Sequence, residues 1–334
     1  MKLGCSSSSY DALIRSGKLE LMAWVRACAD ELEVDGVEFL DAHFPTTDPI
    51  YLRDLKRLCT DGGLTIAGVA VTNDFGQDER RIPEIDRVRH WCDIAAYLGA
   101  PVVRVFAGTL PAHRPAAAQG VIVSALRKVF GGERVPDRRR LWSDVTWALR
   151  QCADHAAERG VTVALQNRRG GIVSTWQQLA QCTHDVGSPW LRICLDPAGI
   201  EEGPRYEDVL RSTVQVHARL RDVGDDGGDA DVYWPELLRG LKAARYRGFV
   251  LMDYEGNADP AWAMPRATRY LRGVLQLLGR QQMLTAAADT NGASDAAIPA
   301  VFEALSELGE PPQAPSHPPR TAEEARLLEA NRPR

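Results

Sequence analysis

The sequence alternates, eight times between residues 2 and 278, a short apolar stretch with a longer segment whose apolar residues recur every three or four positions. The short stretches predict buried strands, and the recurring pattern predicts amphipathic helices. Strands and helices that alternate in this way form a parallel sheet with crossover helices. Eight units favour a closed (β/α)8 barrel over an open doubly wound sheet. No G-x-G-x-x-G follows the first stretch, so dinucleotide binding has no support.

We therefore expect a single α/β barrel over residues 1–282, followed by a C-terminal extension over 283–334. The predicted strands are 2–6, 34–40, 64–71, 101–108, 161–167, 191–196, 214–220 and 248–255. The predicted helices are 19–32, 48–59 with Asp48 as its cap, 83–98, 141–160, one capped by Ser174 or Thr175 and running through Cys182, 234–246 and 260–278.

Two segments depart from this rhythm. Residues 109–140 carry prolines, basic residues and GGER between the fourth strand and its helix. A connection of this length at the functional face of a barrel is typical of a lid or a dimer contact. Residues 283–334 end in a stretch that includes PPQAPSHPP, a composition that predicts a flexible tail with one short helix near 296–308.

Composition excludes several classes of function. The net charge of -5 gives no global basic field to attract nucleic acid. No apolar run approaches the roughly 20 residues that span a bilayer, and the first ten residues do not form a signal peptide. We therefore expect a cytoplasmic protein with no membrane partner. The seven cysteines show no C-x-x-C spacing, which predicts reduced core residues, with Cys5 and Cys194 as the only thiols considered for catalysis.

Polar and charged side chains gather where the predicted strands end. The carboxyl ends of barrel strands carry the active sites of this architecture, and alternation along each strand selects the inward positions. The residues selected are Glu38, Arg104, Gln166, Arg168, Asp196, His217, Arg219, Arg221, Asp253 and Glu255. Any one of them could be a solvated rim charge, and His217 could be a core histidine. Their convergence at one end of the strands indicates a site.

At these residues the sequence resembles the xylose isomerase-like TIM barrels of the sugar phosphate isomerase/epimerase superfamily. The resemblance covers roughly residues 1–280. The stretches that carry it are residues 73–108, VALQNRRGG at 163–171, LRICLDPAG at 191–199, VHARLRD at 216–222 and FVLMDYEGNADP at 249–260. The family often reads V-A-L-E-N-H-G-G in the second of these, H-x-K-D in the fourth and L-E-Y-E-G-x-x-D-P in the fifth.

The resemblance implies a divalent metal held by Glu, Asp, His and Glu from strands five to eight, two of which can also move a proton beside the substrate carbonyl. The matching positions here are Gln166, Asp196, Arg219 and Asp253. Of these four residues, only Asp196 is the same residue type that the family has at its position. The position three residues after it, often histidine in epimerases, is Gly199.

The side chains at the substituted positions disfavour the binding of a metal ion. Hard cations prefer charged oxygen ligands, and arginine has no lone pair to offer. A guanidinium 4 Å from a dication costs about 8 kcal/mol at an effective dielectric near 20. We expect Arg219 to pair with Asp196 and Asp253 in place of the cation. The alternative is a divalent metal (Mn, Mg, Zn or Co) near Gln166, Asp196 and Asp253.

Asp196, Asp253, Glu255 and His217 are the catalytic candidates, because each can exchange a proton. The substrate-binding candidates are Glu38, Arg104, Gln166, Arg168, Arg219 and Arg221. Arginine forks suit carboxylate or phosphate oxygens. They predict a small anionic or polyhydroxylated substrate: a sugar, a sugar phosphate, or a keto or hydroxy acid.

Taken with the resemblance, these residues predict a sugar isomerase/epimerase-like enzyme, with dehydration as a further reaction of the same type. One alternative is a non-catalytic ligand-binding or partner-subunit protein on the same barrel, and another is a metal-dependent epimerase with an atypical ligand set. DNA repair, which abasic-site nucleases perform on this barrel, requires a histidine-rich metal cluster, and this chain has only seven histidines. A homodimer is possible, since such barrels often pair.

Overall fold

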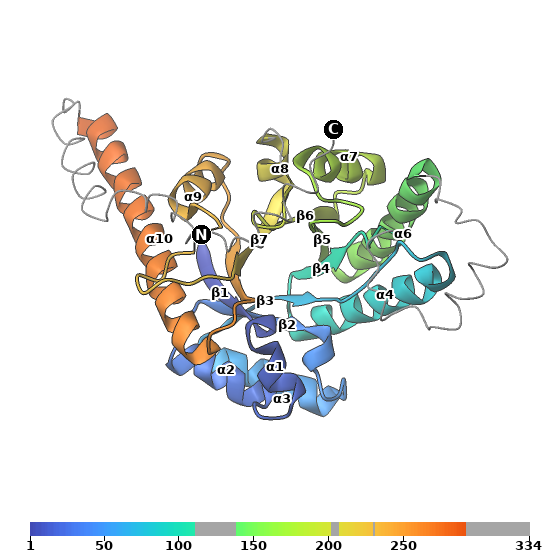
Figure 1. The fold of residues 1–334 in the computed structure, drawn as a ribbon, viewed down its shortest axis with the longest axis horizontal. Helices are drawn as coiled ribbons and strands as arrows, with labels where there is room; N and C mark the ends of the chain where they lie inside the picture. Colours follow the sequence, from blue (N-terminus) through green and yellow to red (C-terminus); the bar gives the residue numbers. More distant parts are fainter. Residues whose placement is uncertain (111–137, 202–206, 230, 292–334) are drawn as a thin grey trace, which may run out of the picture. The chain divides into compact units, whose positions relative to one another are not determined.

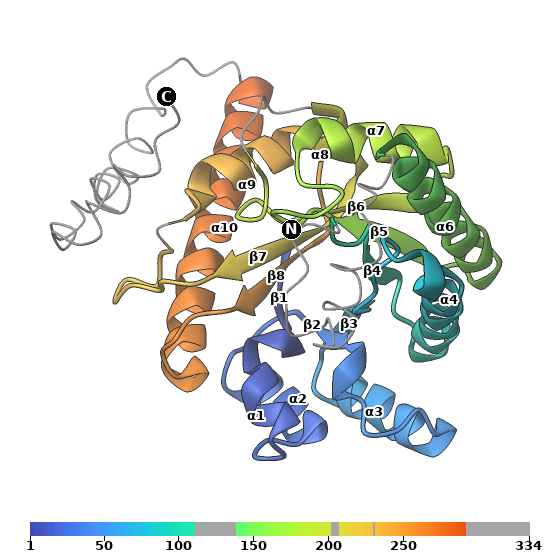
Figure 2. The same ribbon diagram turned by 45° about the vertical axis from the view of Figure 1, so that its right-hand side comes forward.

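Eight parallel strands close into a barrel in the order β1 to β8, and each strand pairs with its neighbours in the sequence. The computed structural model describes residues 1–110, 138–201, 207–229 and 231–291, with side chains up to residue 280. The strands lie at the centre, and α2, α3, α4, α6 and α7 lie around them (Figures 1 and 2). The predicted (β/α)8 architecture is confirmed.

The strands are short, five to eight residues each, and almost entirely buried. Their bounds are β1 Lys2–Ser6, β2 Gly36–Leu40, β3 Thr65–Ala70, β4 Val102–Phe106, β5 Thr162–Gln166, β6 Leu191–Leu195, β7 Thr213–Leu220 and β8 Phe249–Tyr254. Burial on both faces explains why the strands read as continuous apolar runs rather than as an alternating pattern.

The helices of the described residues match the predicted periodic segments, with five short additions, and the last helix continues past its predicted end at residue 278. The bounds are α1 Asp11–Arg15, α2 Leu21–Asp30, α3 Pro49–Asp61, α4 Arg81–Leu98, α6 Arg138–Arg159, α7 Trp176–Val186, α8 Glu207–Ser212, α9 Trp234–Ala243 and α10 Pro260–Asn291. The 3₁₀ helices are η1 Ser7–Tyr10, η2 Asp41–His43 and η3 Asp78–Arg80. Asp48 caps α3 as predicted, and Thr175 rather than Ser174 caps α7 through a capping box with Gln178.

The chain forms two compact units, residues 1–275 and 276–334. The first unit contains all eight strands. The domain boundary predicted at residue 282 stays a prediction. The expected short helix near 296–308 and most of the 109–140 connection lie outside the described residues. Among the helices that are described, none is long and apolar enough to cross a membrane.

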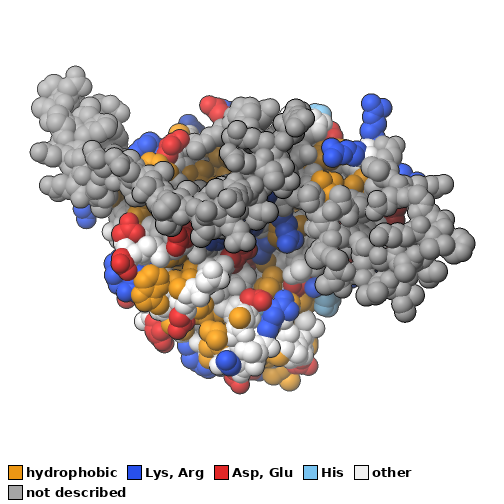
Figure 3. Space-filling view, viewed as in Figure 1, with side chains coloured by type: hydrophobic (Ala, Val, Ile, Leu, Met, Phe, Trp, Pro, Cys, Tyr) orange, Lys and Arg blue, Asp and Glu red, His pale blue; other side chains and the backbone are white. Residues whose placement is uncertain are grey.

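All seven cysteines are buried and unbridged, as the sequence predicted. Burial raises the pKa of the Cys194 thiol well above its ordinary value, which disfavours the reactive thiolate. On the face drawn in Figure 3, basic and acidic side chains of the described residues are interspersed.

Candidate active site

Gln166, the last residue of β5, lies at the centre of the polar cluster at the carboxyl ends of the strands. Its Oε1 accepts a hydrogen bond of 2.5 Å from Arg104 Nη1 on β4. A guanidinium only donates, so the amide oxygen must face Arg104 and the amide nitrogen must face the other way. That nitrogen lies 3.3 Å from Asp196 Oδ2 and 3.2 Å from His217 Nδ1. Gln166 therefore donates to both groups.

Glu38, on β2, is a fully buried carboxylate beneath this centre. Arg104 contacts it with Nε–Oε1 and Nη2–Oε2 distances of 3.4 and 3.5 Å, and Gln215 donates to its Oε1 at 3.1 Å. Burial acts to raise the pKa of Glu38, but Arg104, His217 and Ser6 outweigh burial and bring it to about 2. The Arg104 guanidinium, also buried, has its pKa raised: burial opposes its charge, and the charge of Glu38 prevails.

Asp196 follows β6 and is held from several sides. Arg219 Nη2, from β7, lies 2.5 Å from Asp196 Oδ2, and the amide of Gly199 donates to Oδ1 at 2.9 Å. Asn167 binds the Asp196 backbone twice, since it donates from Nδ2 to the carbonyl oxygen at 2.7 Å and accepts from the amide at 2.9 Å. A Cβ atom at Gly199 would lie 2.5 Å from Asp196 Oδ2. Glycine at position 199 therefore leaves the space in which the Asp196 carboxyl lies.

Asp253 lies on β8 and contacts Ser8 and His217. Its Oδ1 is 2.6 Å from Ser8 Oγ and its Oδ2 is 3.5 Å from His217 Nδ1. We expected Arg219 to pair with both aspartates, and for Asp253 this is wrong. The β7–β8 register places Arg219 beside Asp253, but the guanidinium reaches towards Asp196, and Ser8 takes the place beside Asp253.

The remaining predicted residues lie at the rim. Glu255 is exposed, with its Oε2 3.6 Å from Arg219 Nη1 and 3.3 Å from Arg221 Nη2. Arg168 is also exposed and lies over the Phe106 ring, 5.5 Å from its centroid. These groups can contact a substrate at the mouth. They are further from the buried cluster than the sequence alone suggested.

The residues at the family's metal positions do not fit a divalent cation. Gln166 presents its amide nitrogen to Asp196, and Arg219 places a guanidinium nitrogen against the same carboxyl. Both groups offer hydrogens where a cation requires lone pairs. No cluster of three or more His, Cys, Asp and Glu side chains with a metal-binding arrangement occurs among the described residues.

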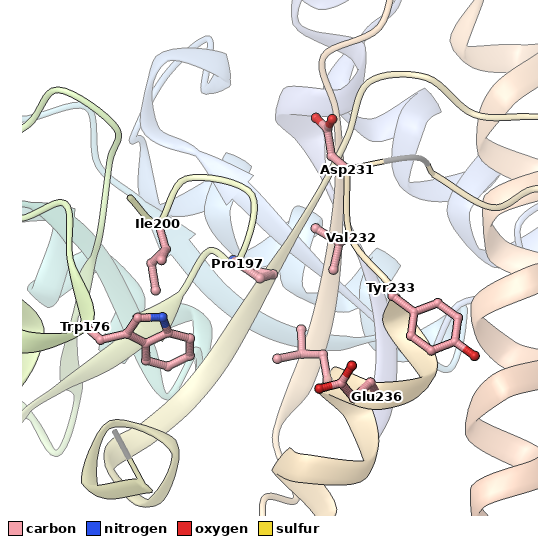
Figure 4. Close-up of a pocket in the computed structure, with 8 residues that line it drawn as sticks. Trp176, Pro197, Ile200, Asp231, Val232, Tyr233 and Glu236 are labelled. Atoms are coloured by element: carbon pink, nitrogen blue, oxygen red, sulfur yellow. The ribbon is translucent and has the colours of Figure 1, made fainter. Parts of the chain in front are cut away.

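A separate pocket of about 210 Å³ lies beside the cluster, between the segment after β6 and the start of α9 (Figure 4). Trp176 and Ile200 lie on one side, Val232 and Glu236 on the other, and Pro197 between them. The pocket is lined by Trp176, Pro197, Ile200, Asp231, Val232, Tyr233, Glu236 and Leu237. Pro197 directly follows Asp196, so a ligand in the pocket would lie close in the chain to that carboxyl. No sequence pattern indicated the pocket.

Four polar residues of the cluster were missed by the sequence reasoning: Ser6, Ser8, Asn167 and Gln215. Strand alternation selects charged residues most readily, whereas serine and amide side chains occur widely in loops. The run of four serines directly after the first predicted strand was the available signal for Ser6 and Ser8.

The arrangement can bind an oxyanion and move a proton. Arg219 Nε is buried and finds no hydrogen-bond partner among the residues that the structure describes, although the same guanidinium contacts Asp196 and Glu255. A buried donor of this kind can stabilise negative charge that develops on a substrate oxygen. Asp196 and Asp253 can each accept or donate a proton beside it.

Comparison with known proteins points to one family. A family model described as xylose isomerase-like TIM barrel matches residues 25–274. No curated protein matches the sequence.

Solved structures with the same fold include several sugar epimerases. D-psicose 3-epimerase from Clostridium cellulolyticum H10, solved with D-tagatose, gives a TM-score of 0.63 at 16% identity over 83% of this chain and 99% of that chain. 3-Keto-D-glucoside 4-epimerase from E. coli gives 0.62 at 18% identity over 82% and 99%, respectively. L-ribulose 3-epimerase gives 0.62 at 15% identity over 85% and 97%. At these identities, the likeness shows a common fold.

Proposed function

The chain belongs to the xylose isomerase-like TIM barrel family, and within it we propose a sugar isomerase- or epimerase-like enzyme that abstracts a proton next to a carbonyl without the family's divalent metal. The observation that carries the proposal is the placement of Arg219. Its guanidinium contacts Asp196 and keeps one buried donor, Nε, to which no group in the described part of the chain is hydrogen-bonded. A fixed cation with a free donor beside a carboxyl is what enolate formation requires.

In the proposed reaction, a carboxyl removes the proton from the carbon next to the substrate carbonyl. The electron pair of that C–H bond forms the carbon–carbon double bond of an enolate, and the carbonyl oxygen takes the negative charge. Arg219 Nε–H donates to this oxygen. A proton returned to carbon completes an isomerisation or epimerisation. Asp196 and Asp253 form the proton-transfer pair, with His217 between Asp253 and Gln166.

We propose a polyhydroxylated or anionic small molecule as the substrate. The structural neighbours named above are epimerases of ketoses and a keto-glucoside. The rim of this site adds Arg168 and Arg221, whose guanidinium groups suit carboxylate or phosphate oxygens. A sugar phosphate or a sugar acid would use both the rim and the buried cluster.

The direct test uses a panel of sugars, sugar phosphates and keto acids. Compounds that raise the melting temperature are then incubated with the protein in deuterated water, and NMR follows exchange of the hydrogen next to the carbonyl. Exchange is expected with the wild type and is lost in Asp196→Asn and Asp253→Asn. Asp222→Asn, an exposed control, retains it. Full exchange in both site variants would reject the roles of these carboxyls.

The role of Arg219 has its own test. Arg219→Lys keeps a positive charge but removes the Nε donor, so we expect kcat to fall about 100-fold with a smaller change in KM. An unchanged kcat would show that the unpartnered Nε does not act in the reaction.

A second candidate is a ligand-binding protein or partner subunit without catalysis. The observation that favours it is the saturation of Asp196, which already accepts from Arg219, Gln166 and Gly199. Three donors already occupy the oxygens of this carboxyl, which leaves fewer lone pairs free to meet a substrate. Stabilisation by a ligand without hydrogen exchange at any carbon would support this alternative over the enzyme.

The third candidate is a metal-dependent epimerase with an atypical ligand set. Metal analysis of protein purified without chelator separates it from the first. One Mn, Zn, Co or Mg ion per chain, together with exchange activity that EDTA abolishes, would establish the metal-dependent enzyme and overturn the metal-free proposal.

A further inference from the structure

Four consecutive serines, Ser6–Ser9, begin where β1 ends and connect it to both neighbouring strands. Two of them bind backbone: Ser7 Oγ accepts from the Leu40 amide at 2.8 Å, and Ser9 Oγ accepts from the Tyr254 amide at 3.0 Å. The other two, Ser6 and Ser8, bind the carboxyls of the active-site cluster. The segment therefore combines a structural role with a role at the site.

Ser6 and Ser8 join Glu38 to Asp253 through a chain of oxygen atoms. Ser6 Oγ lies 2.9 Å from Glu38 Oε2 and 2.7 Å from Ser8 Oγ, and Ser8 Oγ lies 2.6 Å from Asp253 Oδ1. All three separations are hydrogen-bond distances between oxygens. Each hydroxyl carries one hydrogen, so two hydrogens are available for three contacts. With both carboxyls ionised, two oxygens in the chain would face each other without a hydrogen.

The additional hydrogen does not belong to Glu38. Arg104 contacts both oxygens of that carboxyl within 3.5 Å. Burial opposes the charge of Glu38, yet the charge of Arg104 and the hydrogen bond from Ser6 act to hold its pKa below the ordinary value. At neutral pH Glu38 is therefore the ionised end of the chain, and it accepts from Ser6.

His217 does not supply the hydrogen either. Because Arg104 fixes the amide orientation of Gln166, the Gln166 nitrogen donates to His217 Nδ1. An accepting Nδ1 carries no hydrogen, so the ring hydrogen of His217 lies on Nε2. Nδ1 also faces Asp253 Oδ2 at 3.5 Å. Two acceptors this close repel each other less when Asp253 is uncharged.

We infer that Asp253 carries the third hydrogen on Oδ1, and that Ser8 and Ser6 are positioning residues that keep it there by completing a chain from Asp253 to Glu38. Asp253 donates to Ser8, Ser8 donates to Ser6, and Ser6 donates to Glu38. The catalytic meaning of this inference rests on the proposed function, whereas the protonated carboxyl itself is a property of the resting protein.

In the proposed reaction, the inference assigns a direction to the two carboxyls. Asp196, ionised beside Arg219, takes the proton from carbon, and the C–H electron pair moves into the enolate. Asp253 gives its proton to the enolate, whose electron pair forms the new C–H bond. The product leaves with Asp196 protonated and Asp253 ionised, and exchange with water restores the starting state. One proton enters and one leaves, with no change of oxidation state.

Infrared spectroscopy of the resting protein tests the chain without substrate. Protein shown to be metal-free is recorded at neutral pH, unlabelled and with carbon-13 in the side-chain carboxyls of aspartate. We expect a carbonyl stretching band of a carboxylic acid that shifts with the label and is absent from Asp253→Asn. It should be lost in Ser8→Ala, retained in Ser8→Thr, and retained in Ser9→Ala, whose hydroxyl lies outside the chain.

Absence of a label-sensitive acid band from the wild type overturns the inference, and so does a band that Ser8→Ala leaves unchanged. The hydrogen-exchange assay is read separately. In Ser8→Ala we expect kcat to fall about 100-fold and Ser8→Thr to restore most of it. An acid band without exchange activity would retain the protonated chain and reject the proposed enzyme. Exchange activity without an acid band would support the proposed enzyme and reject the protonated chain.

Discussion

The pair formed by Glu38 and Arg104 makes stability depend on pH. The pKa of Glu38 is about 2 in the folded protein against an ordinary value of 4.5, so below pH 4.5 the unfolded chain binds a proton that the folded chain does not. This stabilisation is complete above pH 4.5 and is lost as the pH falls towards 2. Between pH 5 and pH 3 it should decrease by about 2 kcal/mol.

Urea unfolding at the two pH values measures this change. Glu38→Gln should lose less stability than the wild type between pH 5 and pH 3, by about 2 kcal/mol, although it is less stable at both because Arg104 is left unpaired. Asp222→Asn, on an exposed side chain, should behave like the wild type. Equal losses in the wild type and Glu38→Gln would contradict the shifted pKa.

Two residues separate this site from one that suits a metal. Gln166→Glu with Arg219→His creates a Glu, Asp, His, Asp set together with Asp196 and Asp253. We expect the double variant, unlike the wild type, to gain several degrees in melting temperature when Mn²⁺ is added, because the new side chains offer lone pairs in place of hydrogens. Isothermal titration with Mn²⁺ gives the stoichiometry. A wild type that binds Mn²⁺ as tightly as the double variant would contradict this account.

The residue-level network could be predicted only in part. Strand parity was enough to select Gln166, Asp196 and His217 as neighbours at one end of the barrel. It could not predict that Gln166 faces Arg104 with its oxygen, because parity gives the face on which a side chain lies and not the neighbouring group that its amide oxygen meets. The same limit explains why Asp253 was expected beside Arg219 and is instead beside Ser8.

At the scale of elements, two asparagines fasten neighbouring strand ends in the same way. Asn73, after β3, binds the amide and carbonyl of Phe106 at 2.9 and 2.8 Å. Asn167, after β5, binds the amide and carbonyl of Asp196 at 2.9 and 2.7 Å. Each side chain replaces a piece of strand pairing where the backbones separate.

These two residues form a matched experiment. Asn73→Ala and Asn167→Ala should each lower the free energy of unfolding by about 2–3 kcal/mol, since each leaves two backbone groups unpaired, at the partly buried Phe106 and at the buried Asp196. Only Asn167→Ala releases Asp196, so it alone should slow hydrogen exchange by at least about tenfold at a temperature where both variants are folded. Urea unfolding and NMR measure the two effects. Equal slowing of hydrogen exchange in both variants would show that Asn167 does not position Asp196 for the reaction.

Elements long enough to show a period were predictable, and the short ones were not. The predicted strand 64–71 is β3 Thr65–Ala70, and the predicted helix 83–98 lies within α4 Arg81–Leu98. The missed helices α1 and α8 have five and six residues, which is too short for a 3.6-residue period to repeat. The serine segment after β1 forms a 3₁₀ turn whose role depends on contacts distant in the sequence.

For the whole molecule, the eight-fold repeat predicts the architecture because a parallel barrel is what repeated strand–helix units can close into. Every residue of the polar cluster lies in the first compact unit, residues 1–275. The described part of the site is assembled from strand ends and the residues that directly follow them, in a unit that contains all eight strands.

A chain shortened to residues 1–282 should therefore fold and bind like the full chain. It retains the closed barrel and all polar contacts described for the site, and the removed residues have the composition of a tail. We expect the melting temperature to change by no more than about 4 °C, which for a domain of this size corresponds to roughly 1 kcal/mol. The shortened chain should also be stabilised by the same compounds of the panel and should catalyse hydrogen exchange at the wild-type rate. A shortened chain that aggregates would show that the extension is part of the fold, and one that folds but fails to bind would assign the extension a place in the site.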